Sequence, residues 1–150
     1  MKKSPKEAKL EEILRSSKLV AGGFLGDDLR GVSEIVEDDA VTLAKLQVTA
    51  KQLATRMQKI TDIAKAALGN WVTVDDKWSA KVEEAKGILI CPWGHLGKFA
   101  KRVTTVKLVE SGQTAQWSDL SIHFINEHSF FEGKGARYRI DPEKLVKIIF

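Results

Sequence analysis

The only cysteine and all three histidines of the chain lie in one window, between positions 91 and 128. Cys91 and His95 form a Cys-x3-His pair, and His123 and His128 form a His-x4-His pair further along. Thiolate sulfur and imidazole nitrogen are the donors that Zn²⁺ takes in tetrahedral protein sites. The spacing therefore predicts a zinc site built from these four residues.

The helical spacing of the second pair limits this prediction. Residues five apart differ by about 140° in direction around a regular helix. Cys91, His95 and His123 are therefore the better-supported trio, and His128 is expected to join only if the helix ends irregularly. Without a metal, His123 would lie over Asp119, His128 would act as a cation at the helix end, and the cysteine would be a small core residue.

The number of ligands decides between a structural and a catalytic metal. Four protein ligands would close the coordination shell, whereas three would leave a position for water, with Glu127 or Glu132 as the base. A thiol enzyme using Cys91 with His95 is a further alternative. The sequence favours a small binding or regulatory protein over an enzyme, because the spacing of His123 and Glu127 departs by one residue from that of inverted zinc-protease helices.

The strands and helices predicted around these residues indicate an α+β fold. Cys91 follows a short buried strand at 88–90 and begins a Pro- and Gly-containing turn. A hairpin is predicted over 101–117, and Ser118 is expected to cap a helix that ends near His128. This order over residues 91–128 is similar to the ββα unit of a zinc finger, although a typical finger has two cysteines and carries ligands within its hairpin.

The remaining sequence predicts an N-terminal helical part followed by a small β-hairpin-plus-helix part. We place them at residues 1–70 and 71–150 and expect one compact unit. Helices are predicted over 5–19 and within 32–69, where Thr49 is expected to cap a second helix unless the whole stretch is one long helix.

Three shorter features complete the prediction. The glycine-rich connector 21–31 is expected to surround a buried Phe24–Leu25 pair. Residues 75–86 are predicted to form a short helix, and residues 138–140 a short strand. A last helix is expected to begin at Asp141-Pro142.

Basic residues suggest a second kind of site. The net charge of +4 permits contact with nucleic acid or an acidic partner. The candidate contact residues lie in two segments and are Lys98, Lys101, Arg102, Lys134, Arg137 and Arg139. Residues 43–60 also have the residue spacing of a helix-turn-helix, with Arg56 and Lys59 on its second helix.

Composition excludes several classes of protein. The mean hydropathy is −0.18, and no apolar run is long enough for a membrane span. One cysteine excludes an intramolecular disulfide, and the acidic residues near the start interrupt any secretory apolar segment, so we expect a cytoplasmic protein. A metal-free homodimer joined through the apolar stripe Leu53–Ala67 is the remaining alternative.

Overall fold

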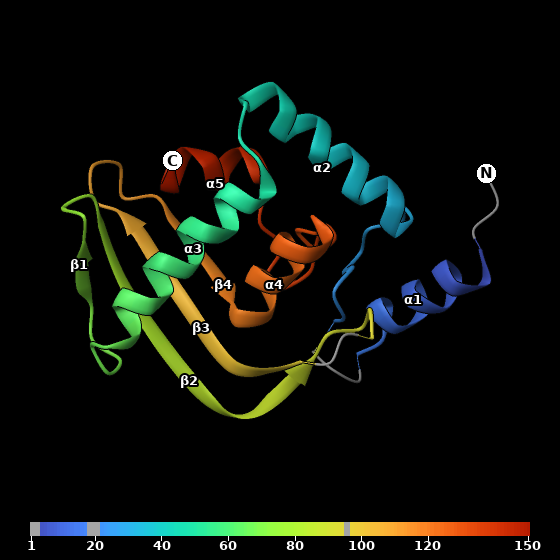
Figure 1. Cartoon of the computed structure of the whole chain (residues 1–150), viewed down its shortest axis with the longest axis horizontal. Helices are drawn as coiled ribbons and strands as arrows, with labels where there is room; N and C mark the ends of the chain where they lie inside the picture. Colours follow the sequence, from blue (N-terminus) through green and yellow to red (C-terminus); the bar gives the residue numbers. More distant parts are fainter. Residues whose placement is uncertain (1–3, 18–21, 95–96) are drawn as a thin grey trace.

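A computed structural model describes residues 4–17, 22–94 and 97–150. It confirms the α+β class: helices pack on a four-stranded antiparallel sheet (Figure 1). In chain order the elements are α1 (Pro5–Arg15), α2 (Val32–Leu46), α3 (Ala50–Lys65), β1 (Val72–Val74), β2 (Trp78–Ile90), β3 (Lys98–Leu108), β4 (Thr114–Ser118), α4 (Asp119–His128) and α5 (Pro142–Ile149).

A side-chain cap fixes where α3 begins, and a backbone turn fixes where α2 ends. The Thr49 hydroxyl accepts from the Gln52 backbone N–H, and the Gln52 side chain accepts from the Thr49 backbone N–H, which is a complete capping box. Gln47 stands in the left-handed conformation and ends α2. The stretch 32–69 therefore contains two helices separated by a turn.

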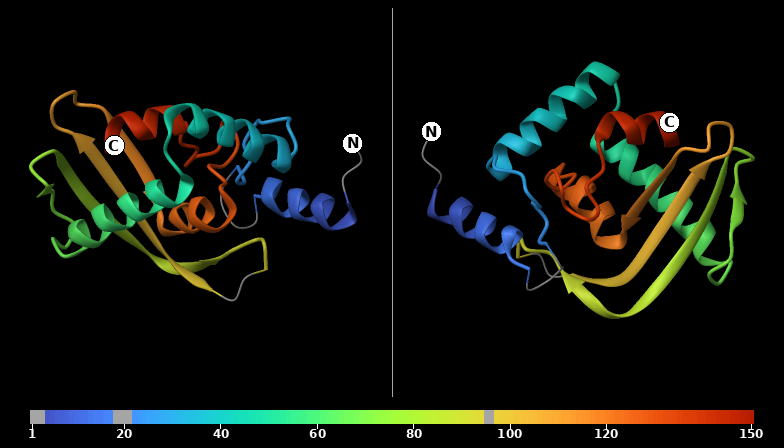
Figure 2. Two further views of the ribbon diagram at one scale, coloured as in Figure 1. Left: turned by 45° about the horizontal axis from the view of Figure 1, so that its top comes forward. Right: turned by 180° about the vertical axis from the view of Figure 1, so that it is seen from behind.

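The sheet is dominated by one long hairpin. β2 and β3 pair from Trp78↔Leu108 to Ile90↔Lys98, so the described residues 91–94 and 97 lie at the tip of this hairpin. A bulge between Ala85 and Ile88 interrupts the register. The hairpin curves, and α3, α4 and α5 lie within its curve, while the tip reaches α1 (Figures 1 and 2).

Two predicted elements are wrong. Residues 75–86 are not a helix but the β1–β2 turn and most of β2, because residues 78–85 pair with β3. Residues 138–140 form no strand: Tyr138 lies in a turn, and Arg139 and Ile140 form an irregular segment before α5. The predicted strand at 88–90 exists as the end of β2, but only its central Leu89 is buried, and both flanking isoleucines are half-exposed.

Two apolar clusters form the interior, and each combines residues from before and after position 70. The first joins α3 to the sheet, α4 and α5 around Trp78 and Trp117. The second joins α1, the buried Phe24–Leu25 pair and α4 around Phe124. No helix among the described residues is both long enough and apolar enough to cross a lipid bilayer.

Candidate metal centre

Three of the four predicted metal ligands meet in the structure. The ligand atoms of Cys91, His123 and His128 all lie within 4.8 Å of one another. The Cys91 Sγ is 3.5 Å from the His128 Nε2. The fourth predicted ligand, His95, lies outside the described residues.

Two elements position this cluster. Cys91 follows the last residue of β2 at the tip of the long hairpin, where only 2% of it is exposed. The histidines project from α4, whose start is fixed by a capping box between Ser118 and Ser121. The cluster therefore connects the hairpin tip to a helix that begins directly after β4.

The structure corrects the expectation for His128. The helix remains regular through this residue and ends at Ser129 in the left-handed conformation. The imidazole nevertheless joins Cys91 and His123, although no irregular helix end brings it there. The angle of about 140° describes where the side chains leave the helix. It does not prevent the two imidazole rings, at the ends of their side chains, from approaching one thiol that lies between them.

Aromatic rings border the two histidines. The Trp93 ring is stacked on that of His128, with centroids 4.0 Å apart and an interplanar angle of 12°. The Phe99 ring lies 4.6 Å from that of His123. These contacts restrict the orientation of both imidazoles, and sequence reasoning missed them because stacking partners leave no spacing signal.

The separation of one pair of donor atoms, from Cys91 and His128, fits tetrahedral zinc coordination. Zn–S and Zn–N bonds of about 2.3 and 2.1 Å place sulfur and nitrogen about 3.6 Å apart in such a site. The observed distance of 3.5 Å between Cys91 Sγ and His128 Nε2 matches this value. A thiol–imidazole hydrogen bond has a similar length, so the arrangement suits either state of the cluster.

The two carboxylates considered as catalytic bases do not join the cluster. Within the described part of the chain, no Asp or Glu belongs to a potential metal-binding group with these three residues. Glu127 is exposed and accepts a hydrogen bond from Asn126 Nδ2. Glu132 is buried and faces the Ser121 hydroxyl.

Two of the predicted anion-contact arginines are engaged within the protein. Arg139 makes a two-pronged ion pair with Asp39, and it also donates to the Glu132 carbonyl. Arg102 bonds Glu84 and Asp119.

The other four predicted contact residues, Lys98, Lys101, Lys134 and Arg137, are exposed. Lys101 and Arg137 line one hollow together with Arg102. Contact with nucleic acid stays a prediction that the arrangement of these residues does not test.

The helix-turn-helix residues bond to other parts of the chain, and the stripe residues contribute to the interior. Arg56 donates to the Ile149 carbonyl, and Lys59 pairs with Asp75. The stripe on α3 packs inside the chain, with Leu53 and Met57 fully buried, so this face is covered in the folded protein.

Comparison with protein families, with curated proteins and with solved structures found no match to this chain.

Proposed function

We propose that the chain binds one Zn²⁺ through Cys91, His123 and His128, and that the metal stabilises a binding or regulatory protein. The observation that carries this proposal is the convergence of one sulfur and two imidazole donors within 4.8 Å. A mixed sulfur and nitrogen donor set favours zinc over magnesium or calcium, which prefer oxygen ligands.

A structural role is better supported than a catalytic one. Cys91 is 2% exposed, and the Trp93 ring covers one face of the His128 ring. A thiol nucleophile needs access to its substrate, which such burial opposes. A metal at this position would tie the hairpin tip to α4 and so stabilise the folded chain.

His95 is proposed as the fourth ligand, as its spacing from Cys91 predicts. A fourth protein ligand closes a structural zinc site, whereas a water in its place leaves the site open for chemistry. The contribution of His95 therefore separates the structural role from a metal-dependent enzyme.

The test is metal analysis of the full chain purified without chelator. We expect one zinc per chain, and loss of most of it in Cys91→Ser, His123→Asn and His128→Asn. Replacement by Co²⁺ should give a sulfur-to-cobalt charge-transfer band that disappears in Cys91→Ser. Zinc at a thousandfold excess over its dissociation constant should raise the unfolding free energy by about 4 kcal/mol.

Glu127→Gln is the matched control, because Glu127 lies on α4 between the two histidines and is exposed. This variant should keep its zinc. A chain that holds no stoichiometric metal, or one whose zinc survives Cys91→Ser, would contradict the proposal. His95→Asn should weaken zinc binding at least tenfold if the site is closed; unchanged binding would instead indicate an open position.

A further inference from the structure

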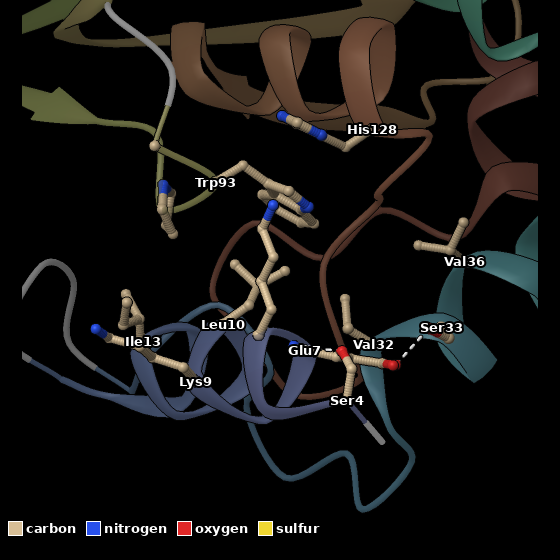
Figure 3. Close-up of a pocket in the computed structure, with 13 residues that line it drawn as sticks. Ser4, Glu7, Lys9, Leu10, Ile13, Val32, Ser33, Val36, Trp93 and His128 are labelled. Atoms are coloured by element: carbon tan, nitrogen blue, oxygen red, sulfur yellow. Dashed lines mark hydrogen bonds between the residues drawn. The ribbon is translucent and has the colours of Figure 1, made fainter. Parts of the chain in front are cut away.

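A groove lies between the N-terminal helix and the tip of the long hairpin. Its walls are α1, the start of α2, and the turn that follows β2, and its volume is about 540 Å³. Figure 3 shows Leu10 and Ile13 on one side of this opening and Trp93 and His128 on the other. This volume is within the range of small-molecule sites, which is roughly 300–1,000 Å³.

The surface of the groove is mainly apolar. Leu10, Val36 and Trp93 are only partly buried, and 36% of Ile13 is exposed. These side chains come from three separate segments, α1, α2 and the hairpin tip, and all line the same opening. A continuous apolar surface assembled from separate segments is typical of a binding site rather than of scattered exposed residues.

The charges at the groove are predominantly positive. Lys6 and Lys9 line it from α1, and both side chains are exposed. The acidic residue between them, Glu7, accepts a hydrogen bond from the Ser33 hydroxyl and so points toward α2 (Figure 3). The ammonium groups of Lys6 and Lys9 therefore lie beside the apolar surface of the groove, and the Glu7 carboxylate is hydrogen-bonded to Ser33.

We propose that this groove binds a small amphipathic carboxylate, a molecule with an apolar chain or ring and one anionic end. The apolar part lies over Ile13, Leu10 and Trp93, and the carboxylate lies near Lys6 and Lys9. Burial of the apolar part of the ligand supplies most of the affinity, and the lysines select for its carboxylate. The groove shares His128 with the metal cluster, and Trp93 stacks on the His128 ring. The two lysines, Leu10 and Ile13 lie outside that cluster, so the proposal does not rest on bound zinc.

The test is calorimetric titration of the full chain with octanoate and, separately, with octanol. We expect saturable binding of one octanoate per chain, with and without zinc. The double variant Lys6→Gln/Lys9→Gln should weaken octanoate binding about fivefold and leave octanol binding unchanged, because only octanoate carries a charge. Ile13→Gln should weaken both probes about threefold through lost apolar contact.

Matched controls use exposed residues outside the groove. Lys45→Gln/Lys51→Gln and Leu29→Gln should leave both titrations unchanged, since these side chains are exposed and do not line the groove. Absence of saturable octanoate binding, or equal binding to the double lysine variant, would overturn the proposal. A dimer that dissociates in Ile13→Gln during sedimentation would also overturn it, because a second copy would then occupy the groove.

Discussion

Glu132 carries a carboxyl group in a buried position where its charge has little compensation. Only 4% of the residue is exposed, and the Ser121 hydroxyl is 3.5 Å from its Oε2. The neighbouring Arg139 is bonded to the carboxylate of Asp39 and to the backbone carbonyl of Glu132. Burial raises the pKa of Glu132 to about 8, against the opposing effects of the serine and the arginine.

This carboxyl group should make stability depend on pH. Its folded-state pKa of about 8 exceeds the ordinary value of 4.5, so the folded chain keeps a proton that the unfolded chain releases between these values. The unfolding free energy should therefore fall as pH rises through this window, by up to about 1.4 kcal/mol per pH unit. Glu132→Gln should remove this decline.

The measurement is chemical denaturation near the two ends of that window, with chelator present so that metal binding does not contribute. Glu83→Gln is the control, because Glu83 is exposed on β2 and should leave the pH dependence intact. Equal slopes for the parent chain and Glu132→Gln would show that the buried carboxyl group does not control the effect.

The donor types of the metal cluster could be predicted from residue identity, but their geometry could not. Cys91 and His123 were expected to meet, and they do. The sequence predicts that His128 joins only if the helix ends irregularly, but it joins the cluster from a regular helix. Helical angles give the direction of a Cα–Cβ bond, whereas the position of a ring nitrogen also depends on side-chain torsions and on neighbours such as Trp93.

At the level of elements, β2 shows why local sequence can mislead. Residues 75–86 are rich in alanine, glutamate and lysine, which favour helix, and Asp75 resembles a helix cap. In the structure Asp75 and Asp76 both have positive φ and form the tight turn between β1 and β2. Trp78, Ala80 and Val82 are buried in strict alternation, which is the strand signal that the helix propensity concealed.

By contrast, the caps and the β3–β4 hairpin could be predicted correctly. Thr49 and Ser118 cap the helices that they were expected to cap. These signals act within a few residues, so the sequence contains them completely. The long β2–β3 pairing and the meeting of its tip with α4 depend on contacts between distant segments, which no local pattern encodes.

The contact between two loops gives a prediction at the same scale. Gly133 packs against the backbone of Leu25, and a Cβ added at Gly133 would stand 2.3 Å from the Leu25 carbonyl oxygen. Both segments are buried, so neither can move away freely. Gly133→Ala should therefore lower the unfolding free energy by about 2–4 kcal/mol, as measured by denaturant titration.

Gly112→Ala is the matched control, because nothing lies within 4 Å of a Cβ at Gly112. Its positive φ should cost about 1 kcal/mol without any clash. If the two variants lost equal stability, the close approach of the loops would not be a constraint on the fold.

For the whole molecule, α4 joins the two apolar clusters. Ile122 and Ile125 belong to the cluster around the sheet, and Leu120 and Phe124 belong to the cluster beneath α1. A helix that contributes opposite faces to both clusters should make them unfold together. The helical and α+β parts of the chain would then behave as one cooperative unit.

Leu145→Ala tests this cooperativity. Leu145 is fully buried in the first cluster, and its truncation should cost about 2–5 kcal/mol. Hydrogen exchange should show the same loss of protection in the most protected amides of α3 and of α1, although Leu14 of α1 packs in the second cluster. Lys144→Ala, at an exposed neighbouring position, should change neither the unfolding free energy nor the hydrogen-exchange protection. Loss confined to α3 would indicate two independent units.

The position of α5 has a consequence for synthesis of the protein. The Trp78 indole donates to the carbonyl of Ile148, and Arg56 donates to that of Ile149. Because the ribosome releases the chain from its N-terminus, a nascent chain lacking residues 142–149 holds an incomplete core around Trp78. Such an intermediate exposes apolar surface, which is the kind of surface that chaperones recognise. Closure of the core must therefore wait until α5 has left the exit tunnel.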